Sequence, residues 1–235
     1  MRASGKVVIV EGLIASGKTT LSRELGKALG PNTLVLAEPD EKEGRNPYLA
    51  DYYSSGARWA LSMQLHLLGL RYQMQLQAQY HVLSGHGDAV LDRSFYGDTS
   101  FAHLQLRQGL MTEREFETYS MLYRAMTAHV LLPSICLRVL ASPVICTGRI
   151  VKRMERETGR KCESTVTLDY LKGLETEIDH MIGVLRSQGV TTLDVPWGAE
   201  RDTTELREET VRDLAERVHG LRTNAQFLDT HRRVV

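Results

Sequence analysis

The chain has 235 residues, 42% of them hydrophobic, which is enough for one sizeable core and indicates a single domain with elaborations. Its 29 basic and 29 acidic residues cancel, so nothing attracts the whole molecule to nucleic acid or to an anionic bilayer. The three cysteines lack metal-ligand spacing and no apolar run approaches the ~20 residues that span a membrane, so we expect a cytoplasmic protein without a membrane or nucleic-acid partner.

Short apolar runs rich in β-branched residues alternate with longer segments of helical periodicity. Continuous apolar strands need cover on both faces, and strands that alternate with helices are typical of parallel α/β sheets. The pattern therefore predicts five strands, at residues 6–12, 33–39, 89–94, 134–142 and 191–195. Cys136 and Cys146 are expected to pack in the core.

Two helices between these predicted strands are clear from spacing and start signals. One long helix is predicted over residues 58–80, because apolar residues recur there every three or four positions. Thr112 and Glu115 form a capping box that begins another helix.

The last predicted helix begins with Asp202 and Glu205 in the same arrangement. Its apolar face is expected to carry Val211, Leu214, Val218 and Leu221. Apolar periodicity fades beyond that point, so we expect one domain over residues 1–221 and a C-terminal tail over 222–235.

A phosphate-binding loop follows the first predicted strand. The segment GLIASGKT matches G-x-x-x-x-G-K-[ST], and strand, loop and helix occur in the required order. Backbone N–H groups of such a loop face the phosphates of ATP, while Lys18 reaches the β- and γ-phosphates and Thr19 holds Mg²⁺. The expected nucleotide contacts are Gly12, Ala15, Ser16, Gly17, Lys18, Thr19 and Thr20.

Charged residues end two further predicted strands. The second strand ends at Glu38, and the third ends at Asp92 and Arg93, with Asp98 five residues beyond Arg93. Ligands of open α/β sheets bind at the carboxyl ends of the strands. A lone Glu at a strand end is usually only a solvated charge, but two charged strand ends beside one phosphate loop indicate a site.

In this order, these residues resemble the deoxynucleoside kinase family. The segment from Tyr53 to Gln64 resembles the family's Y-x4-R-W-x4-Q, and Arg71 follows seven residues later. The segment 92–98 resembles its [ED]-R-S-x-Y-x-D. The resemblance runs from residue 6 to residue 195 and implies a P-loop kinase with a doubly wound five-stranded parallel sheet and helices on both faces.

The resemblance also implies an arginine-rich lid near residues 149–164. Arg149-x3-Arg153 resembles its start, and Glu163-x6-Tyr170-Leu171 its exit. The stretch between is longer than usual, which leaves Arg156 and Arg160 open as lid arginines and Glu157 open as a competitor of Glu163.

By the same resemblance, Glu38 is the general base at the 5′-hydroxyl of the acceptor, and Arg93 lies near that hydroxyl and pairs with Glu38 when no phosphate is present. Asp92 helps to place Mg²⁺ with Thr19. The implied catalytic residues are Lys18, Glu38, Arg93, Arg149 and Arg153, and Arg153 and Asp194 join the nucleotide contacts.

For the acceptor, the resemblance implies that Gln64 pairs with the base edge and that Arg71 and Asp98 complete its recognition. Tyr53 and Glu163 would hold the 3′-hydroxyl. Trp59 would line the pocket, although ordinary helix packing explains it nearly as well, and a solvated stripe would also suit Gln64 and Arg71. Ala102 stands where many relatives carry a stacking Phe, so the stacking contact either comes from Phe101 or is absent.

The sequence thus predicts a deoxynucleoside kinase of nucleotide salvage that uses ATP and Mg²⁺, and the resemblance implies a homodimer through long helices. Because a carboxylate accepts hydrogen bonds, Asp98 favours purines or cytosine over thymine, with deoxyadenosine as the weakly preferred acceptor. A nucleoside monophosphate kinase, such as a thymidylate kinase, would need an arginine clamp in place of a base. A nucleotide-binding regulatory protein without turnover is the third alternative.

Overall fold

The computed structural model describes residues 5–38, 46–156, 165–198 and 203–221. Five parallel strands form one sheet in the order β2-β3-β1-β4-β5, which confirms the predicted α/β class. The strands are β1 (Val7–Gly12), β2 (Leu34–Leu36), β3 (Ala89–Asp92), β4 (Ile135–Leu140) and β5 (Thr191–Pro196). Each lies within one residue of its predicted range or inside it, because buried parallel strands are apolar throughout.

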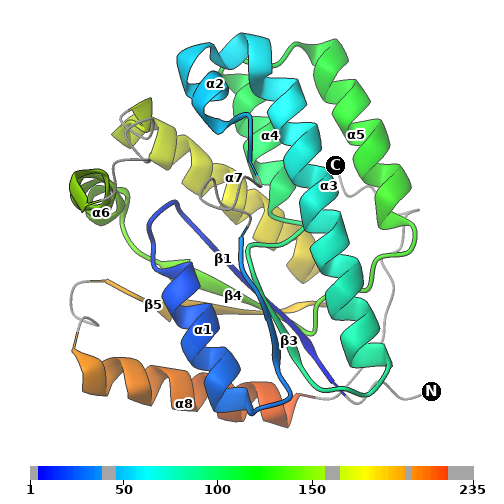
Figure 1. Cartoon of the computed structure of the whole chain (residues 1–235), viewed down its shortest axis with the longest axis vertical. Helices are drawn as coiled ribbons and strands as arrows, with labels where there is room; N and C mark the ends of the chain where they lie inside the picture. Colours follow the sequence, from blue (N-terminus) through cyan, green and yellow to red (C-terminus); the bar gives the residue numbers. More distant parts are fainter. Residues whose placement is uncertain (1–4, 39–45, 157–164, 199–202, 222–235) are drawn as a thin grey trace.

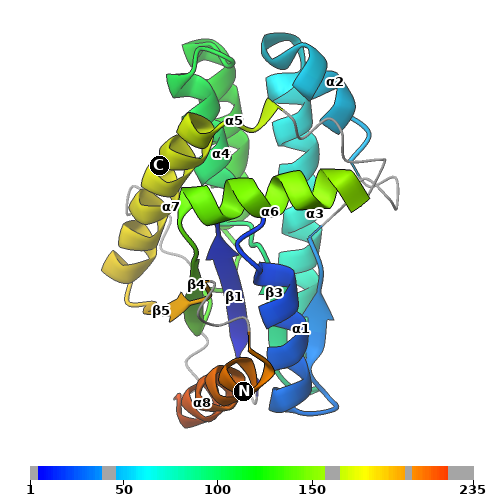
Figure 2. The same cartoon turned by 90° about the vertical axis from the view of Figure 1, so that its left-hand side faces the viewer.

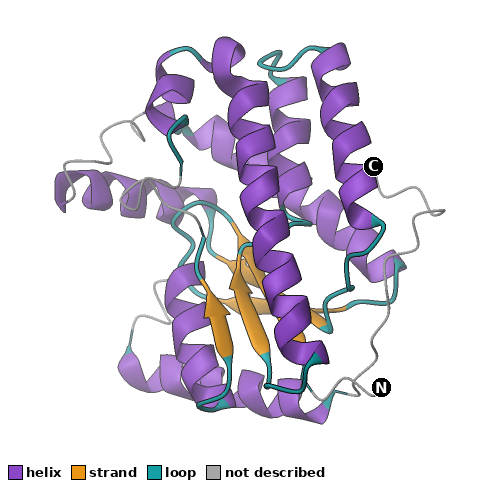
Figure 3. Ribbon diagram, turned by 45° about the vertical axis from the view of Figure 1, so that its right-hand side comes forward, coloured by secondary structure: helices purple, strands orange, loops and turns teal. Residues whose placement is uncertain are grey.

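Eight described helices cover both faces of the sheet (Figure 1, Figure 3). They are α1 (Lys18–Leu29), α2 (Leu49–Ser54), α3 (Gly56–Leu83), α4 (Asp98–Arg107), α5 (Glu113–Thr127), α6 (Pro143–Arg156), α7 (Leu168–Ser187) and α8 (Thr204–Gly220). None of them is both long enough and apolar enough to cross a bilayer.

Two hydrophobic cores lie on opposite faces of the sheet. Val7 and Ile9 of β1 pack into the core that α3, α4, α5 and α7 cover, whereas Val8 and Val10 pack into the core beneath α1 and α8. This alternation is the two-residue period of a strand. Cys136 and Cys146 are buried, as predicted, and Cys162 lies outside the described residues.

The helix starts were predicted with mixed success. Thr112 Oγ1 accepts a hydrogen bond from Glu115 N at 3.3 Å and Thr112 N donates to Glu115 Oε2 at 2.8 Å, which confirms the capping box. The prediction for the last helix was wrong in its start: α8 is preceded by Thr203, whose side chain makes no capping hydrogen bond, and Asp202 lies outside the described residues. The buried face of α8 carries Val211, Leu214 and Val218 as predicted.

The strand order places the carboxyl end of β1 at a point where the connections diverge. The chain leaves β1 for β2 at one edge, returns to β3, and then crosses to β4 on the other side of β1. The loops after β1 and β3 therefore lie side by side at the carboxyl edge of the sheet, which is where ligands of open α/β sheets bind. Figure 2 shows α6 lying across the carboxyl end of β1.

Candidate active site

The loop after β1 has the backbone geometry of a phosphate-binding loop. Gly17 precedes α1 with a φ of 107°, and a Cβ there would lie 2.5 Å from the Trp197 ring, so only glycine fits. Lys18 begins α1, which turns the positive end of the helix dipole toward the loop. The buried Ser16 Oγ has no hydrogen-bond partner among the described residues, which leaves it available to a ligand.

Lys18 is a buried cation inside this loop. Its Nζ donates to Leu13 O at 2.8 Å. Burial, with the nearby Arg93 guanidinium, lowers the pKa of Lys18 to about 8, although Glu38, Asp92 and Glu11 oppose the shift. Burial destabilises the charged form of Lys18, and a bound polyphosphate would stabilise that form again. The loop therefore favours an anionic ligand.

Asp92 and Thr19 form a small oxygen cluster beside the loop. Thr19 Oγ1 donates to Asp92 Oδ2 at 2.5 Å, and the buried Asp92 Oδ1 has no hydrogen-bond partner among the described residues. Burial raises the pKa of Asp92 above its usual value. Mg²⁺ prefers oxygen ligands and often takes only one or two from the protein, so these two side chains suit Mg²⁺ held with nucleotide phosphates.

Glu38 bridges two arginines at the end of β2. Its Oε1 accepts from Arg93 Nε at 2.6 Å and from Arg71 Nη2 at 3.0 Å. Burial alone would raise the pKa of Glu38, but Arg93 and Arg71 outweigh it and lower the pKa to about 2. The Glu38 side chain is 33% exposed, whereas both arginines are buried, so the carboxylate is the accessible member of the cluster.

Asp98 is the centre of a second, fully buried network. Its Oδ2 accepts from Gln64 Nε2 and from Tyr119 Oη, each at 2.7 Å, and its Oδ1 pairs with Arg71 Nη1. Gln64 Oε1 in turn accepts from Gln105 Nε2 at 3.1 Å. The alternative of a solvated stripe at Gln64 and Arg71 is therefore wrong, because both side chains are buried.

Phe101 connects the two networks. Its ring lies under the Arg93 guanidinium at 4.7 Å and the Arg71 guanidinium at 5.5 Å, distances suited to cation–π contacts. Ala102, the next residue, is fully buried. Of the two neighbours, Phe101 is thus the one beside the charged cluster.

Comparison with known proteins agrees with this geometry. The deoxynucleoside kinase family matches residues 8–220 of the chain. The chain belongs to the deoxynucleoside kinase family. It is 33% identical over 192 residues to a deoxyguanosine kinase of Dictyostelium discoideum. The aligned region covers 82% of this chain and 64% of that protein.

Two further relatives extend the comparison. A deoxyadenosine kinase of Dictyostelium discoideum is 29% identical over 204 residues, with 87% of this chain and 77% of that protein covered. A solved deoxyadenosine kinase of M. mycoides, with bound dATP, has a TM-score of 0.71 and 22% identity, with 89% of this chain and 98% of that chain covered. This chain spans just under two thirds of the Dictyostelium deoxyguanosine kinase and over three quarters of the deoxyadenosine kinase.

Two residues that the family resemblance assigned to the acceptor lie on the helices above the sheet. Trp59 packs against Tyr48 at a ring distance of 5.8 Å and under the Arg58 guanidinium at 4.6 Å, which favours the helix-packing explanation. Tyr53 packs at the border of two hydrophobic clusters. Glu163, with Glu157 and Arg160, lies outside the described residues.

The deoxynucleoside kinase fold places the two predicted lid arginines on α6. Arg149 donates to Ser16 O at 2.9 Å, to Ala15 O at 3.5 Å and to Trp197 O at 3.2 Å, so it ties α6 to the phosphate loop and to the end of β5. Arg153 lies one turn further along α6 and is partly buried.

Asp194, one of the predicted nucleotide contacts, is paired with a residue of the neighbouring strand. It lies within β5, its Oδ1 is 4.0 Å from Arg138 Nη1, and Arg138 also pairs with Asp179 of α7. The carboxylate thus engages the face that α7 covers, whereas the phosphate loop leads into α1 on the other face. The nucleotide contact of Asp194 stays a prediction.

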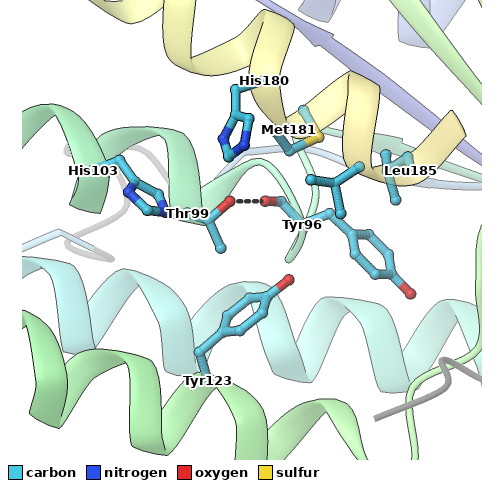
Figure 4. Close-up of a pocket in the computed structure, with 8 residues that line it drawn as sticks. Tyr96, Thr99, His103, Tyr123, His180, Met181 and Leu185 are labelled. Carbon is cyan, nitrogen blue, oxygen red and sulfur yellow. Dashed lines mark hydrogen bonds between the residues drawn. The ribbon is translucent and has the colours of Figure 1, made fainter. Parts of the chain in front are cut away.

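A cavity and a groove lie away from the charged cluster of Glu38, Arg71 and Arg93. A cavity of about 20 Å³ between α4, α5 and α7 is lined by Tyr96, His103 and His180, among others, and has room for about one water molecule (Figure 4). A groove of about 680 Å³ runs between α1 and α8, beside Lys27 and Arg212. Neither is lined by Glu38 or Lys18, so neither is the candidate active site. We place that site at the carboxyl edge of the sheet, where these two residues lie.

Sequence patterns missed Glu11, Gln105 and Tyr119. Glu11 looked like part of a strand, and Tyr119 has the spacing of an ordinary core residue in α5. Each acquires its polar partner from a segment far away in the sequence.

Proposed function

We propose that this protein transfers the γ-phosphoryl group of ATP to the 5′-hydroxyl of a deoxynucleoside, with Mg²⁺, in nucleotide salvage. The observation that carries the proposal is the Glu38 carboxylate, held by Arg93 and Arg71 at the sheet edge that also carries Lys18 and the Asp92–Thr19 cluster. In this proposal the phosphoryl donor, the metal and the acceptor hydroxyl take separate positions along this edge. The names of the kinase relatives support the same reaction.

Glu38 is the base in this proposal. With a pKa of about 2 it is ionised at neutral pH but is weakly basic while both arginines hold it. When Arg93 turns toward the γ-phosphate, the loss of that pairing raises the basicity of Glu38 toward the proton of the 5′-hydroxyl. Lys18, Arg93, Arg149 and Arg153 supply positive charge around the transferred group.

The phosphorylated acceptor of a nucleoside monophosphate kinase suits this cluster less well. Such an acceptor would bring its own negative phosphate beside the carboxylates of Glu38 and Asp98, which costs electrostatic energy in a partly buried site. A hydroxyl acceptor brings no charge and uses the base that Glu38 provides.

Asp98 supports a preference for purines or cytosine over thymine. Gln64 and Tyr119 occupy its Oδ2 and Arg71 takes one lone pair of Oδ1, so the second lone pair of Oδ1 is the one left for an amino group or N–H of the base. Deoxyguanosine kinase and deoxyadenosine kinase are the names of the Dictyostelium relatives, and a deoxyadenosine/deoxycytidine kinase of Bacillus subtilis is 28% identical over 177 residues.

A panel of acceptors tests this function. ADP formation with ATP and Mg²⁺ is expected for deoxyadenosine, deoxyguanosine and deoxycytidine, and kcat/KM for thymidine is expected to be about 10- to 100-fold lower, the effect of an unpaired acceptor in the pocket. Deoxynucleoside monophosphates serve as the comparison. Thymidine as the best acceptor would contradict the base assignment, and turnover of the monophosphates alone would contradict the proposed reaction.

We further propose that the protein is a cytoplasmic homodimer that associates through α3 and α5. These helices contact each other, and their outer surfaces carry exposed apolar side chains at Leu76 and Tyr80 of α3 and at Met121 and Leu122 of α5. Tyr80 is 69% exposed and Met121 56%, and exposed apolar side chains gathered on neighbouring helices can mark a protein contact site.

The paired change Tyr80→Asp with Met121→Asp is expected to shift the protein from dimer to monomer in sedimentation equilibrium, because it places charge in an apolar contact. Val144→Asp on α6, which is also exposed and apolar, is the matched control and should leave the mass unchanged. A dimer that survives the paired change would place the interface elsewhere.

A further inference from the structure

Glu11 is a buried carboxylate with no part in the reaction described above. It is the penultimate residue of β1, directly before the phosphate loop, and its side chain is fully buried. Burial raises the pKa of Glu11 above its usual value, although Arg93 and Ser94 oppose the shift. Burying a carboxylate costs free energy unless strong partners hold it, so the contacts of Glu11 indicate its role.

One oxygen of Glu11 shapes the turn after β3. Glu11 Oε1 accepts from Ser94 N at 2.8 Å and from Ser94 Oγ at 2.6 Å, and Ser94 Oγ accepts from Gly97 N at 3.1 Å. A Cβ on Gly97 would lie 2.4 Å from Glu11 Oε1, so the turn closes directly on the carboxylate. Within this turn Arg93 has a φ of 67°, a strained left-handed conformation that surrounding contacts must hold.

The other oxygen of Glu11 faces the guanidinium of Arg93. Glu11 Oε2 lies 3.6 Å from Arg93 Nη1, and neither atom has a hydrogen-bond partner among the described residues. Arg93 instead donates through Nε to Glu38 at 2.6 Å and through Nη2 to Gly12 O at 3.3 Å. The guanidinium therefore lies between two carboxylates and is engaged closely by only one of them.

We propose that Glu11 is a positioning residue that holds Arg93 when Arg93 leaves Glu38, so that Glu38 is free to accept the proton of the acceptor hydroxyl. The inference rests on the proposed function. A buried guanidinium that lost Glu38 would otherwise be unpaired until it met the phosphate, which is costly in a site of low dielectric. Since Glu11 already holds the turn through Ser94, a small rotation of the Arg93 side chain brings the second carboxylate into hydrogen-bond range without a movement of the backbone.

Glu11→Gln tests this role, because it removes the charge and keeps an oxygen that can accept from Ser94. We expect kcat to fall about tenfold or more while the KM values for ATP and deoxynucleoside change less than about threefold, the pattern of an interaction needed in the transition state only. In an Arg93→Ala background, the same change is expected to lower kcat by less than about twofold, because Glu11 acts through Arg93. Glu177→Gln, which removes another buried carboxylate paired with Arg107, is the control.

The outcomes separate positioning from support of the fold. Unchanged kcat in a folded Glu11→Gln protein overturns the inference, and so does an equal loss of kcat with and without Arg93. If the glutamine variant does not fold, Glu11→Asp is compared in the same two backgrounds, and a loss of kcat that persists without Arg93 again overturns it. Turnover of deoxynucleosides by the wild type, measured first, tests the proposed function by itself.

Discussion

Glu38→Gln is expected to lower kcat by about 10² to 10⁴ while leaving the affinity for ATP nearly unchanged, because a neutral amide cannot take the proton of the 5′-hydroxyl. The phosphate loop, with Lys18 and Thr19, does not depend on the Glu38 charge for its backbone geometry. Steady-state kinetics with saturating ATP and direct nucleotide binding measure the two quantities. Asp51→Asn, at an exposed carboxylate of α2, is the control and should retain full activity.

The pH dependence adds a second test of Glu38. Since Arg93 and Arg71 lower its pKa to about 2, the carboxylate is ionised in the free protein at every pH above about 3. The quantity kcat/KM reports groups of the free protein, so its acid limb between pH 4 and 6 should not change in position when Glu38 is replaced. Unchanged kcat in Glu38→Gln would contradict the assignment of the base, whereas an acid limb near pH 5 that disappears in this variant would contradict the low pKa of Glu38.

Lys18→Ala is expected to lower kcat/KM for ATP by about 10² to 10³. This is the usual effect of removing one hydrogen-bond donor that stabilises charge on the transferred group. Lys18 is the buried cation at the start of α1, and its ammonium donates a hydrogen bond to Leu13 O within the loop. Lys27→Ala, at an exposed lysine of the same helix, is the control and should change kcat/KM by less than about twofold.

The lowered pKa of Lys18 also predicts a basic limb. Phosphate binding needs the ammonium form, which is lost as the pH rises through about 8 in the free protein. Between pH 8 and 10, kcat/KM for ATP should therefore fall about tenfold per pH unit, while kcat at saturating ATP falls later because bound phosphates raise the pKa again. A flat kcat/KM across this range would show that Lys18 keeps its proton or does not contact the nucleotide.

Much of the fold follows from local sequence. The five strands could be placed because buried parallel strands are continuous apolar runs, and the phosphate loop because its glycines, Lys18 and Thr19 must be adjacent in the chain. The hydrogen bonds between Thr112 and Glu115 join residues only three positions apart, so the start of α5 could also be predicted from local sequence. For α8 the local sequence predicted Asp202 as the residue before the helix, whereas Thr203 holds that position in the structure.

The charged site was predictable only in part. Glu38, Arg71, Arg93 and Asp98 were expected near one another, since strand ends of a parallel sheet share an edge and the family pattern contains them. The resemblance also implied the pairs Arg93–Glu38 and Arg71–Asp98, whereas the contact between Arg71 and Glu38 was not predicted.

Only the tertiary structure decided which polar groups hold the others. Glu11 reaches Ser94 across 83 residues, Gln64 is engaged by Gln105 across 41, and Arg149 meets Ser16 across 133. Such contacts depend on the order of the strands, the register of their neighbours and the rotamers that packing permits. A periodicity of two or 3.6 residues indicates which face a side chain occupies, but it carries no information about the partner that another segment brings to that face.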